Sequence, residues 1–238
     1  MWFNHLVIRE FPKNLRFVIF LILALFSFAE HTFAQKVKVQ IESPQELKGR
    51  KAILSTCERG FAATVHSVKL GYLPLELEID PGLVPDLYQL YVSQVNGSLF
   101  FFLEPGTKIK LDTTDLSKSI VTNSKSNPEW KLFYENIQQP SDDRIKNFSK
   151  GERRARKASQ ADSLNFYVDK QTVERQDLLK KTGEFILDHP ASFVSLYLLK
   201  ANWYAFKNQG VFEKLDASLA GHRNYSFLKG KSRSIVRN

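Results

Sequence analysis

Cysteine is almost absent from this sequence, because Cys57 is the single cysteine among 238 residues. One thiol cannot form a disulfide, a Cys-x-x-Cys redox pair or a cysteine-based zinc site within one chain. The sequence therefore excludes dithiol redox chemistry of its own. A lone cysteine is either a small buried hydrophobic residue or a reactive thiol, and the position of Cys57 within a predicted strand favours the buried interpretation.

Motifs that carry catalysis are missing as well. The sequence has no Gly-rich phosphate-binding loop, no Gly-x-Ser-x-Gly turn and no His-Glu-x-x-His helix. Beyond residue 34 the histidines are His66, His189 and His222, and no two of them lie three or four residues apart, as metal-binding histidines on one element do. We therefore expect no enzyme activity, no cofactor and no metal site. We interpret His66 as a strand residue and His189 as a helix-end residue.

Long hydrophobic runs are also scarce, and the longest lies near the N-terminus. Basic residues precede an apolar run that begins at Phe17, and small residues follow it up to Ala34. This order is typical of a secretory signal peptide, and we expect cleavage after Ala34. The alternative is an uncleaved anchor, but the run is shorter than the roughly 20 apolar residues that a spanning helix needs. We therefore predict a periplasmic or secreted protein with no membrane span after the signal is removed.

The net charge of +9 and the pI of about 9.5 come from an excess of lysine and arginine. A basic surface favours anionic partners in general, and the compartment decides which of them the protein meets. Since we expect export, nucleic acid is not an expected partner. The hydrophobic fraction of 43% is enough for a substantial core.

Between residues 35 and 124 apolar and polar residues alternate with a period of two. Val37, Val39 and Ile41, for example, alternate with lysine and glutamine. Turn residues recur at short intervals and leave no room for helical crossovers. This pattern predicts an antiparallel β-sandwich or barrel of seven or eight strands.

One stretch near the end of this region is interpreted as a core hairpin. Residues 99–103 and 108–112 flank Pro105-Gly106, a pair that suits a type II turn. Three consecutive phenylalanines in the first strand leave it no polar face, so we expect it to be covered on both sides.

From residue 125 onward the periodicity is that of helices. Asn127-Pro128 should start a helix with Asn127 as its cap, and Pro140 should end it. Residues 141–158 are polar and basic, as in a linker or a weakly packed helix entry, and a long helical pattern follows over residues 159–187. The predicted class is α+β, with a signal peptide (1–34), an antiparallel β domain (35–124), a helical region (125–228) and a loose basic tail (229–238).

A basic run is the one candidate binding site in the sequence. It begins at Lys150, and we assign the site itself to a cluster of Arg153, Arg154, Arg156 and Lys157. It could bind an anionic lipid or glycan. The simpler interpretation is a solvated helix start, where positive charge is mildly unfavourable.

Three stretches carry a resemblance to a known family. They are Phe101-Phe102-Leu103-Glu104-Pro105-Gly106-Thr107-Lys108-Ile109, Ile120-Val121-Thr122-Asn123-Ser124-Lys125-Ser126-Asn127, and residues 185–199. The first two resemble the leucine-glutamate, proline, glycine and glycine-serine-x-x-asparagine signature of a bacterial envelope domain of unknown function. The third resembles the helical segment that follows it. Asn123 stands where the family more often has glycine.

The resemblance implies an accessory role. In the family this domain usually precedes a thioredoxin-like domain with a Trp-Cys-x-x-Cys site, in secreted thiol-disulfide oxidoreductases of the TlpA and AhpC/TSA type. Those catalytic positions do not occur in this sequence, so no catalytic residue is carried over. We therefore expect a non-catalytic interaction module. The alternatives are the scaffold half of a split oxidoreductase, with a thioredoxin-like envelope protein as partner, and a binder of anionic envelope glycan or lipid. The oligomeric state is left open.

Overall fold

The computed structural model describes residues 37–58, 61–79, 82 and 84–236. All of them fall within one compact unit, Val37–Asn238, so the β region and the helical region are not separate units. The change from strand to helix lies between Thr122 and Ser126, at the predicted boundary. The predicted signal peptide and its cleavage after Ala34 lie outside the described residues.

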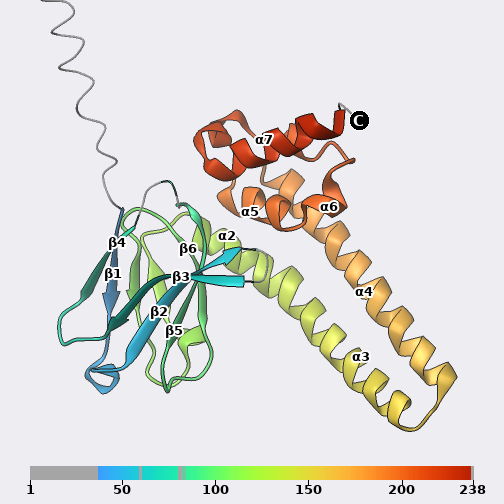
Figure 1. The fold of residues 1–238 in the computed structure, drawn as a ribbon, viewed down its shortest axis with the longest axis horizontal. Coiled ribbons are helices and arrows are strands. Elements are labelled where there is room, and N and C mark those ends of the chain that lie inside the picture. Colours follow the sequence, from blue (N-terminus) through green and yellow to red (C-terminus); the bar gives the residue numbers. More distant parts are fainter. Residues whose placement is uncertain (1–36, 59–60, 80–81, 83, 237–238) are drawn as a thin grey trace, which may run out of the picture. The chain divides into compact units, whose positions relative to one another are not determined.

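In the described residues, eight strands form two sheets of four (Figure 1). One sheet has the order β4-β1-β7-β8 and the other the order β3-β2-β5-β6. The strands are β1 (Val37–Glu42), β2 (Lys51–Glu58), β3 (Phe61–Lys69), β4 (Leu75–Ile79), β5 (Asp86–Val92), β6 (Leu99–Leu103), β7 (Lys108–Lys110) and β8 (Ile120–Thr122).

Alternation places one face of each sheet in a shared core. In β1 the side chains of Val37, Val39 and Ile41 are buried, and they pack in the same cluster as Leu90 and Phe101 of the other sheet. The two sheets are separate and face one another, which confirms the sandwich and makes the alternative of a barrel wrong.

The prediction of a wholly antiparallel fold is also wrong. β1 pairs with β7 in parallel, with Gln40 opposite Lys108 and Ile41 opposite Ile109. A parallel pair needs a long crossover connection, which we expected only from a helix. Here strands of the opposite sheet provide the connection, because the chain forms β2, β3, β5 and β6 before it returns as β7.

The predicted hairpin over residues 99–112 is not formed, although its turn is. Gly106 has a φ of +81°, and the Thr107 N–H donates to the Glu104 carbonyl at 3.1 Å, as the turn requires. β6 then pairs with β5, whereas β7 pairs with β1 and β8 in the other sheet. The turn therefore carries the chain from one sheet to the other.

The phenylalanine strand is covered on its inner side, as predicted, but only partly covered on its outer side. Phe101 lies in the core between the sheets, whereas Phe102 points outward into a second core formed with the helices. Phe100 shares the outer face with Phe102 but is 46% exposed, because the helices cover only part of that face.

Six α-helices follow in the described residues. They are α2 (Ser126–Phe133), α3 (Gln139–Lys157), α4 (Ala161–Asp188), α5 (Phe193–Ala201), α6 (Trp203–Phe206) and α7 (Arg223–Val236). Short 3₁₀ turns at Phe212–Lys214 and Ala217–Gly221 join α6 to α7. In Figure 1, α3 and α4 run antiparallel as a helical hairpin.

Two helix predictions are wrong near Pro140. The helix does not end there, because a π-helical stretch, η5 (Tyr134–Gln138), joins α2 to α3 and Pro140 lies in the first turn of α3. A wider π turn accommodates a residue that lacks an N–H. Residues 141–158 are therefore not a linker, and they pack along α4 through side-chain hydrogen bonds such as Ser149 Oγ to Gln171 Oε1 at 3.0 Å.

The second core lies between the outer face of the β3-β2-β5-β6 sheet and the helices. Leu87 and Phe102 from the sheet pack there with Phe133, Phe185 and a group of residues from α5, α6 and α7. In α5 the side chains of Val194, Leu196, Leu198 and Leu199 are all buried, so this helix is enclosed on most sides.

The predicted loose tail is helical as far as the structure describes it. α7 runs through residues 229–236, and Leu228 within it is fully buried. Leu228 packs in the second core directly before this basic segment. None of the helices in the described residues has the length and apolar composition needed to cross a bilayer.

Candidate functional site

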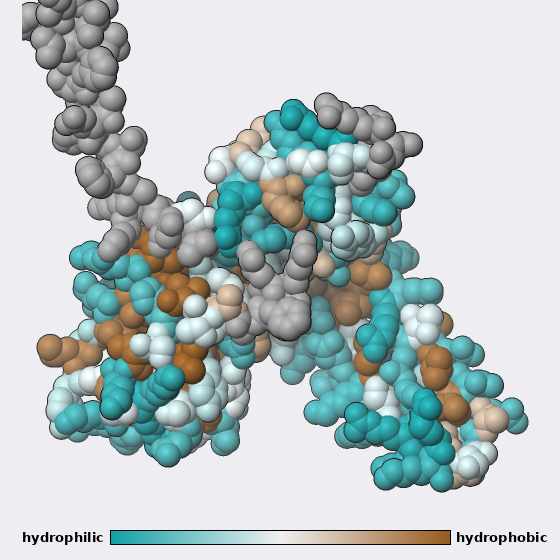
Figure 2. Space-filling view, viewed as in Figure 1, coloured by the Kyte–Doolittle hydropathy of each residue, from teal (hydrophilic) through white to brown (hydrophobic). Residues whose placement is uncertain are grey.

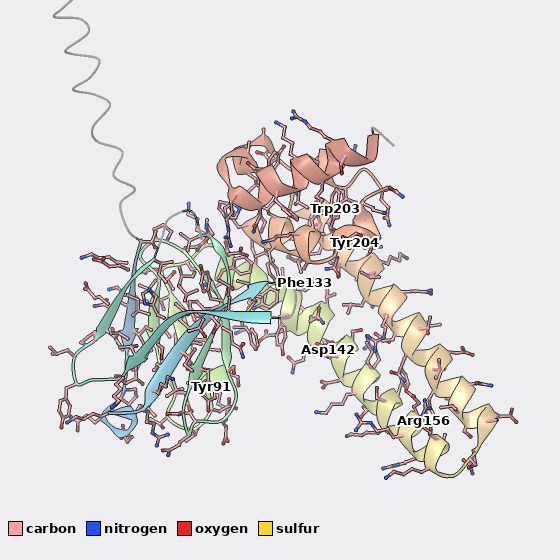
Figure 3. The ribbon with its side chains drawn as sticks, in the orientation of Figure 1. Tyr91, Phe133, Asp142, Arg156, Trp203 and Tyr204 are labelled. Carbon is pink, nitrogen blue, oxygen red and sulfur yellow. The ribbon has the colours of Figure 1, made fainter. Side chains whose placement is uncertain are left out.

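The predicted basic cluster lies at the C-terminal end of α3, where Arg153, Arg154, Arg156 and Lys157 are all exposed. Figure 3 labels Arg156 near this end of the helix and Asp142 near its start. The prediction of a helix start is therefore wrong. Positive charge at a helix C-terminus is favourable, because the carbonyl groups there carry the negative end of the dipole.

Arg156 differs from the other members of the cluster. Its Nη2 pairs with Glu152 Oε1 at 2.8 Å, and Glu152 Oε2 accepts a hydrogen bond from Gln171 Nε2 of α4, also at 2.8 Å. These hydrogen bonds hold the pKa of Glu152 below its usual value. Arg156 thus belongs to the polar interface between α3 and α4, and the structure separates it from Arg153, Arg154 and Lys157.

Lys150, which belongs to the predicted basic run, and Lys146, which does not, extend the cluster that remains. Lys146 and Lys150 are exposed, and helical spacing places them in line with Arg153 and Lys157. Sequence reasoning did not include Lys146, because residues 141–158 were not assigned to one regular helix. The spacing of four, three and four residues between these cations is the signal that could have found it.

Cys57 lies in β2, on the sheet face that packs against the helices. Burial raises the pKa of its thiol to about 12, and the negative charge of Asp86 acts in the same direction. The thiol is therefore protonated at neutral pH and behaves as a small hydrophobic residue.

The two signature stretches of the family resemblance meet at the start of α2. The buried carboxylate of Glu104 accepts hydrogen bonds from the Lys125 N–H at 2.6 Å, the Ser126 N–H at 3.3 Å and the Ser126 hydroxyl at 2.6 Å. Asn123 has a φ of +58°, a conformation that glycine also adopts readily, and it turns the chain into the helix. Glu104 is thus the cap of α2, a role that no local pattern in the sequence indicates.

Asn127 is the second link between these stretches, and it is not the helix cap. Its side-chain oxygen accepts from the Phe102 N–H at 2.9 Å, and its side-chain nitrogen donates to the Phe102 carbonyl at 2.7 Å. β6 is an edge strand, so these bonds satisfy backbone groups that would otherwise remain unpaired. Glu104 and Asn127 together fix α2 to the sandwich.

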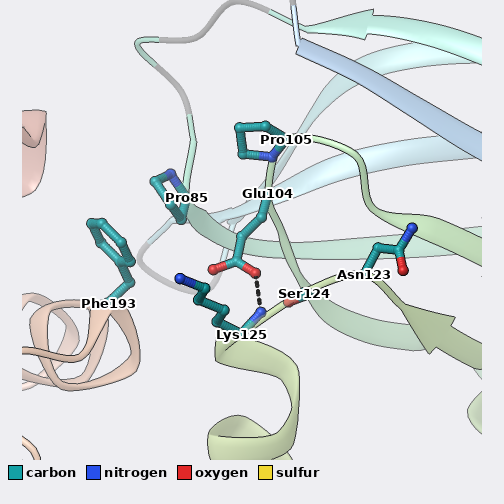
Figure 4. Close-up of a pocket in the computed structure, with 7 residues that line it drawn as sticks. All are labelled: Pro85, Glu104, Pro105, Asn123, Ser124, Lys125 and Phe193. Carbon is teal, nitrogen blue, oxygen red and sulfur yellow. Dashed lines mark hydrogen bonds between the residues drawn. The ribbon is translucent and has the colours of Figure 1, made fainter.

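A pocket of about 500 Å³ lies beside this junction (Figure 4). It is lined by Pro85, Glu104, Pro105, Asn123, Ser124, Lys125 and Phe193. Figure 4 shows the hydrogen bond from the Lys125 backbone to Glu104 within it. Because the Glu104 carboxylate is already bound to the start of α2, it is not available as a general base or a metal ligand.

A buried polar network joins β5 to α5 and α7. Asp86 Oδ2 accepts from Asn224 Nδ2 at 3.0 Å and from Arg223 Nη2 at 3.3 Å, and Asn224 Oδ1 accepts from Lys200 Nζ at 2.8 Å. The carboxylate is thereby compensated within the protein, as a buried charge must be. This network fastens the C-terminal helix to the sheet.

His222 is buried next to this network. Its Nδ1 accepts the Asn224 N–H at 3.1 Å, and its ring packs against Phe193 with centroids 5.5 Å apart. Burial lowers the pKa of His222, and the opposing influences of Asp86 and the Pro85 carbonyl are smaller. His222 is therefore neutral near pH 7.

The other histidines have the structural roles that were predicted. His66 lies in β3 and its Nε2 is 3.0 Å from the Glu78 carbonyl of β4. His189 follows α4, with Nδ1 3.0 Å from the Phe185 carbonyl and its ring stacked on that of Phe185. No three histidine, cysteine or acidic side chains of the described residues are placed to share a metal ion.

Aromatic side chains continue from the second core onto the surface. Trp130 of α2 contacts both Phe102 and Tyr134, with ring centroids 5.9 Å apart in each case. Tyr134 is 41% exposed, and on the outer face of the sheet Phe100 and Tyr91 are 46% and 42% exposed. Figure 3 labels Tyr91 on the sandwich. We call Tyr91, Phe100 and Tyr134 the aromatic face.

The arrangement thus offers two surfaces, the aromatic face and the cationic side of α3, and a set of buried polar groups with structural partners. The aromatic face consists of large exposed rings that continue a buried cluster, which is the composition of a protein contact surface. Comparison of the chain with protein-family models, with curated proteins and with solved structures found no match.

Proposed function

We propose that this protein is an exported, non-catalytic module that binds a protein partner of the cell envelope through the aromatic face. The observation that carries the proposal is the outer face of the β3-β2-β5-β6 sheet, where large apolar and aromatic side chains of β5 and β6 are interrupted by Gln89 and only partly covered by helices. Leu87 and Phe102 are buried under α2 and α5, whereas Tyr91 and Phe100 on the same face are exposed. Exposed aromatic rings beside a packed core are enriched at protein interfaces.

The family resemblance names the partner that we propose, a thioredoxin-like envelope protein. The state of Cys57 supports a scaffold role in such a pair, because a thiol with a pKa of about 12 does not take part in thiol-disulfide exchange near neutral pH. The reactive cysteines of a redox pair would therefore belong entirely to the partner.

Site-specific photo-cross-linking in the cells that make the protein tests this proposal. A photoreactive residue at Phe100 should give a defined adduct with one envelope protein, and the same residue at Ile120 should not. Ile120 is a matched control because it is 58% exposed but lies on β8 in the opposite sheet. Identification of the adduct as a thioredoxin-like protein would support both parts of the proposal. Equal labelling from the two positions, or none from Phe100, would contradict it.

A further inference from the structure

The outward side of α3 carries a row of cations, which we call the basic stripe. It consists of Lys146, Lys150, Arg153, Arg154 and Lys157. Lys146, Lys150, Arg153 and Lys157 are separated by four, three and four residues, so they lie in line along one helix face over about 16 Å. Arg154 flanks this line. All five side chains are exposed, and none forms an ion pair with another described residue.

The acidic residues of α3 do not interrupt this line. Glu152 is turned toward α4, where it binds Arg156 and Gln171. Asp142 and Asp143 lie four and three residues before Lys146, so helical spacing places them on the same side of α3, where they border the stripe at its N-terminal end. The opposite side of the helix packs on α4, as the burial of Ser141 and Ala155 shows. Figure 2 shows the surface of the α3–α4 hairpin as mainly hydrophilic with isolated hydrophobic residues.

The stability of the helix does not explain this row. Cations in the last turn are favourable because of the helix dipole, and Arg154 and Lys157 gain from it. The dipole effect is confined to that turn, so Lys146 and Lys150 lie too far from the helix end to gain. Like charges four residues apart repel, as in Lys146–Lys150, Lys150–Arg154 and Arg153–Lys157. A helix face that only contacts water gains nothing from a row of like charges. An anionic partner would offset the repulsion between these cations.

We propose that the basic stripe docks α3 against the anionic phosphate surface of a lipid bilayer. A straight row on a convex helix can touch a plane of phosphates along its whole length. The long lysine and arginine side chains need no fixed geometry to do so, and each contributes mainly through charge. The five side chains of the stripe are exposed on a convex helix, so the stripe recognises charge density rather than the shape of a single molecule. This inference concerns a surface different from the aromatic face and does not rest on the proposed protein partner.

Vesicle flotation with the full chain tests the proposal. The probes are vesicles of phosphatidylcholine alone and vesicles that also contain phosphatidylglycerol, and the measured quantity is the difference in binding between them. The test variant is K150Q/R153Q/K157Q, in which glutamine preserves helix propensity. The matched control is K69Q/K108Q/K110Q, which removes three exposed cations from β3 and β7. Both variants lower the net charge from +9 to +6, and all three proteins share residues 1–36.

We expect the unsubstituted chain to bind the anionic vesicles, with binding that weakens as salt is added. The stripe variant should bind on the order of a hundredfold more weakly, since each of the three cations near an anionic bilayer contributes roughly fivefold. The control variant should keep most of the binding. Equal losses in the two variants would overturn the proposal in favour of net charge alone. Absence of vesicle binding, or stripe-dependent binding to a soluble sulfated polysaccharide but not to vesicles, would overturn it as well.

Circular dichroism should show an unchanged helix content in the stripe variant. Its thermal stability should equal or exceed that of the unsubstituted chain, because like-charge repulsion along α3 is removed. Cross-linking at Phe100 should be unaffected, so failure of this inference and failure of the proposed protein partner are distinguishable.

Discussion

Replacement of Glu104 should destabilise the protein far more than replacement of an exposed acid. Its carboxylate accepts three hydrogen bonds, from the Lys125 N–H, the Ser126 N–H and the Ser126 hydroxyl, at a site where Glu104 is only 8% exposed. Hydrogen bonds to a charged group contribute about 1.5–3 kcal/mol each, and a buried donor left without a partner costs about 1–3 kcal/mol. The 3.3 Å bond is the weakest of the three, so most of the effect comes from the other two.

Two substitutions separate the loss of charge from the loss of the side chain. E104Q keeps one acceptor oxygen but turns an amide NH₂ toward N–H and O–H donors, so we expect a loss of about 2 kcal/mol. E104A removes every acceptor and should lose about 4 kcal/mol. For a chain of this size 1 kcal/mol lowers the Tm by about 2–4 °C, so E104Q should melt about 4–8 °C lower.

Urea unfolding followed by circular dichroism measures these changes, with E76Q as the control. Glu76 lies on β4 and forms an exposed ion pair with Lys38 at 3.6 Å, which contributes less than about 1 kcal/mol. If E104Q and E76Q unfold within about 0.5 kcal/mol of each other, the capping role that we assign to Glu104 is wrong. S126A should lose about 1 kcal/mol alone and less in the E104A background, because the same hydrogen bond is already absent there.

Three further predictions concern the helical hairpin formed by α3 and α4, the buried side chain of His222 and the thiol of Cys57. G151A should lower the Tm although alanine favours helices by about 1 kcal/mol, because its Cβ would clash with the Tyr167 ring. G230A in α7, where nothing lies within 4 Å of the added Cβ, should raise the Tm. A rise of the Tm in both variants would be inconsistent with the packing described. The unfolded chain binds a proton at His222 more readily than the folded protein does, so unfolding free energy should fall as the pH drops below about 6.5. H222N should make the unfolding free energy depend less on pH below about 6.5. An unchanged slope would contradict the role assigned to the neutral His222 side chain. Cys57 should react with a thiol reagent at pH 8 about a thousandfold more slowly in the native protein than in urea, since its pKa rises from 9.0 to about 12, and a comparable rate in the native protein would contradict its burial.

The sequence predicted which side chains are buried more reliably than which strands pair. Alternation at Val37, Val39 and Ile41 correctly indicates a face that packs in the core. The partner of β1 cannot be inferred from it, because every strand of the sandwich offers a similar apolar face. Pro105-Gly106 likewise specifies a turn of the chain, and the same turn serves a hairpin or a crossing between sheets.

In the candidate site, too, the sequence predicts local features but not contacts between residues far apart in the chain. The charges at residues 153–157 are visible in the sequence, but helix bounds are needed to decide which of them point the same way. Once α3 is known to run from Gln139 to Lys157, Lys146 joins the stripe and Arg156 leaves it. The roles of Glu104 and Asn127 depend on contacts with residues more than 20 positions away, which no local pattern reveals.

The position of β1 in its sheet affects how the chain can fold during synthesis. β1 is the first described strand, yet it lies in the interior of its sheet between β4 and β7. Gln40 acquires its second neighbour only when Lys108 has been made, and β8 must follow before that sheet has all four strands. Pairings so distant in sequence form slowly, so β1 lacks one of its two neighbours until most of the β region has left the ribosome. If the protein is exported, as we propose, this strand order lets it cross a narrow secretion channel as an extended chain and complete its sheets afterwards.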